Sequence, residues 1–102
     1  MLPGAFENRI DLLLKLGFRK EGIAQLKKYL DLLWSANEDL NLISRKMTVD
    51  ELMENHLIDC LLPLKQFPTD VKRVADFGSG GGLPGVVYAI QFPEMTFHLF
   101  DQ

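Results

Sequence analysis

The sequence lacks several features that would assign it to a particular class of protein. A single cysteine, Cys60, among 102 residues leaves no internal disulfide and no paired-cysteine metal site, and it suits a reducing compartment. The longest apolar run, Val86 to Ile90, is far shorter than the roughly 18 residues that cross a bilayer. Glu7 and Asp11 interrupt the segment where a signal peptide would be apolar. We therefore expect a cytoplasmic protein without a membrane segment.

The chain also lacks a large excess of charge of either sign. Fourteen acidic and eleven basic residues give a net charge of −3. The chain therefore does not have the excess of basic residues that is typical of a free-standing nucleic-acid-binding domain. Hydrophobic residues make up 47% and charged residues 25%, as in ordinary globular chains. A chain of 102 residues has room for one small domain or part of a larger one.

The first two-thirds of the chain is predicted to be helical. Apolar residues recur at helical spacing from Phe6 to Leu16, with Gly17 as the stop, and again from Ile23 to Asn37. Residues 38–46 lose the period and are predicted to connect this helix to the next, keeping some helical turns at their start.

A third helix is predicted to begin at a capping box. In Thr48-Val-Asp-Glu51, the threonine hydroxyl can accept from the N–H of Glu51, and the glutamate can reach back to the N–H of Thr48. Apolar residues continue to Leu61, and Pro63 and Pro68 mark the end of the helix and a linker.

The remaining third predicts a strand–helix–strand unit. Residues 72–77 form a β-type run that ends in a glycine cluster, residues 85–92 are expected to be helical, and residues 95–100 form a second strand. Such a unit normally has parallel strands and a right-handed crossover. The sequence therefore predicts an α/β fold. A helical region (1–68) is followed by the start of a Rossmann-like domain (69–102).

Two strands are few for a parallel sheet. Parallel sheets normally have several strands and helices on both faces. We therefore expect the chain to be the N-terminal part of a longer protein, and the isolated fragment to be marginally stable or to self-associate through exposed strand edges.

Two ligand patterns fit the glycine cluster. Gly80-x-Gly82-x-x-Gly85, with Asp101 further on, fits a dinucleotide fingerprint. Asp76-x-Gly78-x-Gly80-x-Gly82 fits S-adenosylmethionine-dependent methyltransferases. Both need glycine because the ligand lies directly on the backbone at the tip of a strand.

Register and charge favour the methyltransferase pattern. If the strand ends at Phe77, the third dinucleotide glycine should stand at position 83, which is Leu83. The carboxylate of Asp76 is expected near the loop, where it would oppose a pyrophosphate but tolerate a ligand with ammonium and sulfonium groups.

Four stretches together resemble one family. They are the run from Val74 to Gly85 ending in Leu-Pro-Gly, then Trp34-x-x-Asn37-x-x-x-Asn41-Leu42, then His56-x-x-Asp59, and then Leu99-Phe100-Asp101. From about Leu26 to Asp101 the chain resembles the bacterial 16S ribosomal RNA methyltransferase G family, also called glucose-inhibited division protein B.

The resemblance implies a helical region on a Rossmann-like (class I) methyltransferase domain. It implies S-adenosyl-L-methionine as cofactor, 16S ribosomal RNA or the small ribosomal subunit as partner, and methylation at N7 of a guanine. Gly78 and Leu83 match loop residues that contact the cofactor, and Asp101 stands where an acidic residue holds the ribose. The expected cofactor-binding residues are Asp76, Gly78, Ser79, Gly80, Gly82, Leu83 and Asp101.

The chain departs from the family in two respects. Cys60 stands where serine is usual, and the family continues well beyond the second strand with further cofactor and RNA contacts. We therefore expect no turnover from this chain alone. Guanine N7 is already a lone-pair nucleophile, so no general base is required. Positioning of the two reactants supplies most of the acceleration, and we nominate no catalytic residue.

Several alternatives stay open. Arg45 and Lys46 are hypothesised to touch RNA, against a solvated basic surface. His56 and Asp59 are interpreted as a structural hydrogen-bonding pair that anchors the helices to the glycine loop, rather than as an acid/base or metal-binding pair. Rival functions are a nicotinamide- or flavin-dependent oxidoreductase fragment and a non-catalytic helical interaction module in residues 1–65.

Overall fold

The N-terminal segment folds as two helices joined at a glycine. The structure, a computed structural model, describes residues 4–40, 47–77 and 82–100. It begins with a 3-10 turn η1 (Glu7–Arg9), helix α1 (Ile10–Lys15), a second turn η2 (Lys20–Gly22) and helix α2 (Ile23–Leu40). Gly17 has φ +105°, the left-handed conformation that ends a helix, so the predicted stop is confirmed. Helix α2 continues three residues beyond the predicted end at Asn37.

The third helix starts at the predicted cap. The N–H of Glu51 donates to Thr48 Oγ1 at 3.1 Å. The carboxylate of Glu51 accepts from the hydroxyl of Thr48 at 3.3 Å, where the capping box predicted the backbone N–H as its donor. The threonine half of the box is therefore confirmed, and it places the first turn, α3 (Val49–Glu51), at the predicted position.

The middle of this helix is wider than an α-helix. A π-helical segment, η3 (Leu52–Ile58), separates α3 from the last turn, α4 (Asp59–Leu61). In a π-helix each N–H bonds five residues back. Residues five apart, Leu52 with Leu57 and Met53 with Ile58, are all buried, so this bonding pattern turns both pairs toward the core.

The predicted linker is packed onto the fold. A 3-10 turn, η4 (Leu64–Gln66), buries Leu64. The ring of Phe67 lies 4.8 Å from the ring of Tyr88 and 5.3 Å from that of Phe92, measured between centroids. The segment between Pro63 and Pro68 is thus packed against the later helix that contains Tyr88.

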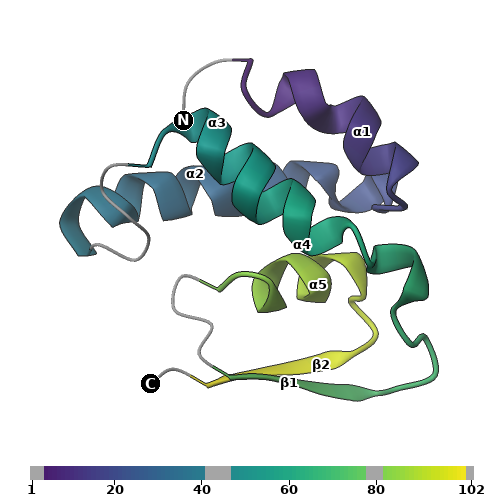
Figure 1. Cartoon of the computed structure of the whole chain (residues 1–102). Helices are drawn as coiled ribbons and strands as arrows, with labels where there is room; N and C mark the ends of the chain where they lie inside the picture. The colour runs from purple at the N-terminus through teal and green to yellow at the C-terminus, as the bar shows by residue number, and fades with distance from the viewer. Residues whose placement is uncertain (1–3, 41–46, 78–81, 101–102) are drawn as a thin grey trace.

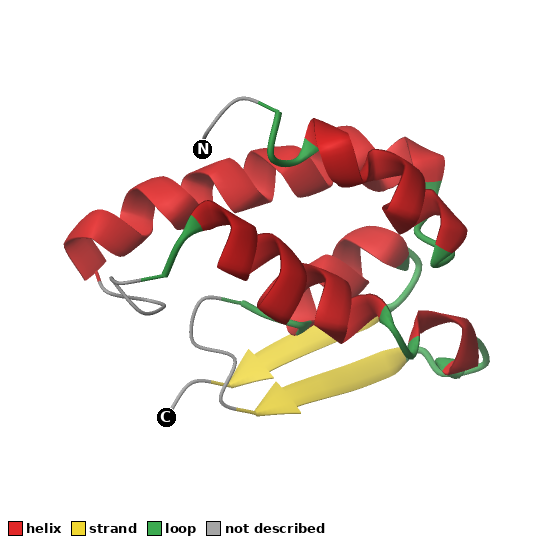
Figure 2. Cartoon of the chain, turned by 45° about the horizontal axis from the view of Figure 1, so that its top comes forward, coloured by secondary structure: helices red, strands yellow, loops and turns green. Residues whose placement is uncertain are grey.

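The strand–helix–strand unit is confirmed. Strand β1 (Arg73–Phe77), helix α5 (Gly85–Gln91) and strand β2 (Thr96–Phe100) begin and end within one residue of the prediction. The strands are parallel, with register from Arg73 opposite Thr96 to Phe77 opposite Phe100. In both views α5 lies between this sheet and the other helices, so within the described residues only one face of the sheet is covered (Figures 1 and 2).

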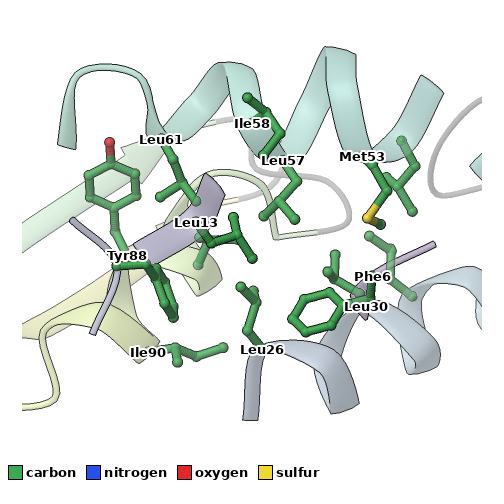
Figure 3. Packing of buried hydrophobic residues seen from close by; sticks show 14 of the residues in the cluster. Phe6, Leu13, Leu26, Leu30, Met53, Leu57, Ile58, Leu61, Tyr88 and Ile90 are labelled. Carbon is green, nitrogen blue, oxygen red and sulfur yellow. The ribbon is translucent and has the colours of Figure 1, made fainter. Parts of the chain in front are cut away.

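One hydrophobic core joins the helical region to α5. Side chains from four parts of the chain meet in it (Figure 3): Phe6, Leu13, Leu26, Leu30, Met53, Leu57, Ile58, Leu61, Tyr88 and Ile90. All are nearly or fully inaccessible to solvent, and each buried aliphatic or aromatic side chain contributes about 1.5–3 kcal/mol. Trp34 lies half-buried against this core.

Polar contacts hold the C-terminal end of α5 against the first helices. The backbone N–H of Arg19 donates to Gln91 Oε1 at 2.6 Å, and Arg19 Nε donates to the carbonyl of Ile90 at 3.0 Å. Gln91 Nε2 donates to the carbonyl of Gly17 at 3.1 Å. These bonds satisfy carbonyls at two helix ends and set the orientation of α5 over the sheet. Within the described ranges, no helix has the length and apolar character needed to span a bilayer.

Candidate cofactor site

The two strands end at the same edge of the sheet. Phe77, the last residue of β1, is paired with Phe100, the last residue of β2. In open parallel sheets, ligands bind outside the carboxyl ends of the strands. The predicted cofactor residues Gly78 and Asp101 come next in the sequence, but they lie outside the described residues, as do Ser79 and Gly80.

Gly82 is the first described residue of the glycine cluster. Its φ is +99°, which residues with a Cβ rarely adopt. A Cβ at this position would lie 2.6 Å from Val86 Cγ2 and 3.0 Å from Tyr29 Oη. Its carbonyl accepts from the N–H of Val86 at 2.6 Å. Gly82 is therefore required by the backbone turn and by close packing against α2 and α5.

Leu83 and Pro84 lead from the loop into α5. Leu83 is half-buried and packs against the core, and the Leu83–Pro84 peptide bond is cis. Pro84 is the residue that caps the N-terminus of the helix, with φ −87°. The prediction that proline suits the start of this helix agrees with that position.

Asp76 is tied to the start of α5. Its Oδ2 accepts a hydrogen bond from the backbone N–H of Gly85 at 2.9 Å. A Cβ on Gly85 would collide with Leu99 Cδ2 and would lie 2.5 Å from Asp76 Oδ2. The absence of a side chain at Gly85 thus lets α5 approach both strands closely enough for this bond to form.

This bond bears on the two ligand patterns. A dinucleotide pyrophosphate uses the free N–H groups at the start of the helix, but the N–H of Gly85 is already bonded to a carboxylate. A negative charge at this point repels phosphate and attracts a cationic ligand. The geometry therefore weighs against the oxidoreductase pattern.

Cys60 and Tyr88 form a partly buried polar contact beside β1. The hydroxyl of Tyr88 donates to the carbonyl of Cys60 at 2.7 Å. Burial, together with the charge of Asp59, raises the pKa of the Cys60 thiol to about 12. Burial, with a smaller effect of Cys60, raises the pKa of Tyr88 to about 12. The thiol is therefore protonated at neutral pH and is not a nucleophile.

Four further predicted residues, His56, Asp59, Arg45 and Lys46, have no contact with the carboxyl ends of the strands among the contacts of the described residues. Asp59 is exposed and His56 is half-buried, and the part of the loop to which they were predicted to anchor the helices lies outside the described residues. Arg45 and Lys46 are outside them too. Among the residues that are described, no group of three or more His, Cys, Asp or Glu side chains is arranged to hold a metal ion.

Comparison with known sequences identifies the family. The sequence model described as rRNA small subunit methyltransferase G matches residues 22–102. The chain belongs to this family. It is 67% identical over 97 residues to ribosomal RNA small subunit methyltransferase G 1 of Bdellovibrio bacteriovorus, covering 95% of this chain and 47% of that protein. Proteins named ribosomal RNA small subunit methyltransferase G from Acidiphilium cryptum and Bacteroides thetaiotaomicron are 45% and 44% identical, over 67% and 81% of this chain and 31% and 38% of their own length.

The chain spans about half the length, or less, of these methyltransferase G relatives. No solved structure is significantly similar to it. The resemblance stated from the four motif stretches is confirmed by the family match, which begins at residue 22, four residues before the stretch that we assigned to it.

Sequence reasoning missed three residues that lie near the glycine loop or beside β1. Tyr29 was only one position of an amphipathic helix, yet its hydroxyl lies against Gly82, and burial raises its pKa. Leu99 was assigned to a strand and to a family motif, and Tyr88 to a helix, but neither was expected to make its contact. Their partners are more than ten residues away in sequence, so local patterns carry no signal for these contacts.

Proposed function

We propose that this chain provides the first part of an S-adenosyl-L-methionine-binding, Rossmann-like (class I) domain in a methyltransferase that acts on N7 of a guanine in 16S ribosomal RNA. The observation that carries the proposal is the family match over residues 22–102, on a strand–loop–helix–strand unit whose parallel strands end at one edge. We retain residues 1–68 as the helical region and 69–102 as the start of the cofactor domain, and we place the protein in the cytoplasm.

The residues present suit this cofactor. Gly82 supplies a left-handed turn without a side chain, and Asp76 places a carboxylate at the start of α5, where a ligand with ammonium and sulfonium groups is favoured. In the proposal, the cofactor is held by Asp76, Gly78, Ser79, Gly80, Gly82, Leu83 and Asp101. When bound, it supplies an electrophilic methyl group for an in-line displacement.

The protein's part in this chemistry is positioning. Guanine N7 attacks through its own lone pair, so no residue needs to remove a proton first, and holding the two reactants in line lowers the barrier. The bond between Asp76 and Gly85 contributes by fixing the loop between the strand end and the helix. We assign no catalytic residue to this chain, and we propose that it has no turnover alone.

A ligand titration tests the cofactor assignment. The 102-residue chain is titrated by calorimetry with S-adenosylhomocysteine and, in parallel, with NADH. Binding of the first and not of the second is expected, and the Gly82→Ala variant should weaken it. Preference for NADH would support the oxidoreductase alternative, and binding of neither ligand would contradict the cofactor assignment.

We propose RNA contact through Arg45 and Lys46, because two adjacent cations suit phosphate binding. Filter binding of a small-subunit RNA fragment to the chain is measured at several salt concentrations. The double variant Arg45→Glu/Lys46→Glu should bind more weakly, with a shallower salt dependence. Lys27→Glu/Lys28→Glu on α2 is the matched control, and equal behaviour of the two variants would contradict the assignment.

A further inference from the structure

Tyr29 of helix α2 lies against the last part of the glycine loop. A Cβ on Gly82 would be 3.0 Å from Tyr29 Oη, so the hydroxyl occupies the space beside the backbone of this buried glycine. The carbonyl of Gly82 accepts from the N–H of Val86, in the first turn of α5, at 2.6 Å. The left-handed turn at Gly82 is therefore enclosed between a side chain of the helical region and the start of α5.

The core fixes the position of Tyr29. Leu26 and Leu30, on the same helix, are completely buried and point into the core (Figure 3). Tyr29 itself is half-buried and packs against that core. Helix α2 therefore cannot move away from the loop without exposing apolar surface to water, which is unfavourable.

The hydroxyl of Tyr29 is not needed to fill space. A phenylalanine ring would pack in the same way, and burying a hydroxyl costs free energy unless it forms hydrogen bonds. Burial raises the pKa of Tyr29, so the hydroxyl is protonated at neutral pH and can both donate and accept. It lies against main chain, whose peptide groups are obligatory hydrogen-bonding groups. The hydroxyl therefore suits a role in holding the backbone of the loop.

We propose that Tyr29 is a positioning residue for the cofactor: its hydroxyl holds the turn at Gly82, and helix α2 thereby sets how tightly the glycine loop binds S-adenosyl-L-methionine. This inference rests on the proposed function, because it takes the loop to be the cofactor site. The proposed contacts Gly78, Ser79 and Gly80 lie in the sequence between the end of β1 and Gly82. A loop that is fixed at its ends loses less conformational entropy when it binds a ligand, which increases the affinity.

The test compares Tyr29→Phe with Tyr88→Phe in the 102-residue chain. Each variant removes one hydroxyl and keeps the ring, but the hydroxyl of Tyr88 donates to the carbonyl of Cys60 on α4. Calorimetric titration with S-adenosylhomocysteine is expected to give an affinity about threefold to tenfold weaker for Tyr29→Phe. Tyr88→Phe should bind like the parent even though it loses stability, so a merely structural role of Tyr29 would not produce the difference.

Amide hydrogen exchange of the ligand-free proteins gives a second measurement. The N–H of Val86 reports on the turn, because it is bonded to the carbonyl of Gly82. The N–H of Phe92 reports on the other end of α5, because it is bonded to the carbonyl of Tyr88. In Tyr29→Phe the Val86 amide should exchange about threefold to tenfold faster, whereas the Phe92 amide should keep the parental rate.

The outcomes separate this proposal from the proposed function. If the parent binds S-adenosylhomocysteine and Tyr29→Phe binds it equally tightly, Tyr29 does not position the cofactor and the cofactor assignment stands. An unchanged Val86 amide, or equal acceleration of the Val86 and Phe92 amides, also overturns the proposal, because the hydroxyl then has no specific effect on the turn. If the parent binds no S-adenosylhomocysteine, the cofactor assignment itself fails, and this proposal is overturned with it.

Discussion

The carboxylate of Asp76, at the end of β1, accepts a hydrogen bond from the backbone N–H of Gly85, at the start of α5. The two residues are nine positions apart and enclose the whole glycine cluster. The bond closes this loop at its base and satisfies an N–H that would otherwise be without a partner at the helix start. It therefore links the stability of the fold to the shape of the candidate site.

Removing this carboxylate should destabilise the chain. Asp76→Ala is expected to lower the free energy of unfolding by about 1–2 kcal/mol, because the N–H of Gly85 loses a charged acceptor in a partly buried position. Urea denaturation followed by circular dichroism measures the change. Asp70→Ala, in an exposed turn, is the control and should cost much less. Equal losses in the two variants would contradict a specific role for the bond.

A side chain at Gly85 should force α5 away from the sheet. Gly85→Ala is expected to cost about 1–3 kcal/mol through overpacking against Leu99 and Asp76. Leu99→Ala removes one of the two obstacles, so the double variant should be less destabilised than the sum of the single variants. Thermal unfolding of all four proteins gives the coupling energy. Simple additivity would show that α5 does not pack on Leu99 as described.

The partly buried thiol of Cys60 predicts a loss of stability at alkaline pH. Burial raises the pKa of Cys60 from 9.0 to about 12. A raised pKa in the folded state means that its contribution is fully present below pH 9 and is lost as the pH rises toward 12. At pH 10 the loss should be about 1 kcal/mol relative to pH 8. Cys60→Ser has no thiol to titrate, so its urea midpoint should fall less between these two pH values, and an identical fall would exclude the thiol as the cause.

The hydroxyl of Tyr88 should contribute a measurable hydrogen bond. Tyr88→Phe keeps the ring packed against Phe67 but leaves the carbonyl of Cys60 without this donor, which is expected to cost about 0.5–1.5 kcal/mol. Chemical denaturation at pH 7 measures the difference. Tyr88→Leu, which also removes the tilted ring contact with Phe67, should cost clearly more. A Phe variant as unstable as the Leu variant would mean that the hydroxyl, and not the ring, carries the contact.

Local sequence patterns predicted the elements well, because helix stops, caps and strand boundaries depend on neighbouring residues. Gly17, Thr48 and the glycine cluster each mark a boundary that the structure contains. The π-helical segment was not predicted, because the apolar spacing around Leu52 and Met53 fits an α-helix as readily, and the packing of the helix on the core selects the wider form.

The sequence by itself determined the family, the order of the elements and the glycine loop between two strands, since these depend on residue types at fixed spacings. Only the tertiary structure decided that Asp76 bonds Gly85 and that Tyr29 reaches Gly82. The physical reason is that each of these features joins residues from different helices and strands. Their distances depend on how α2 and α5 pack on the shared core, which no local pattern specifies.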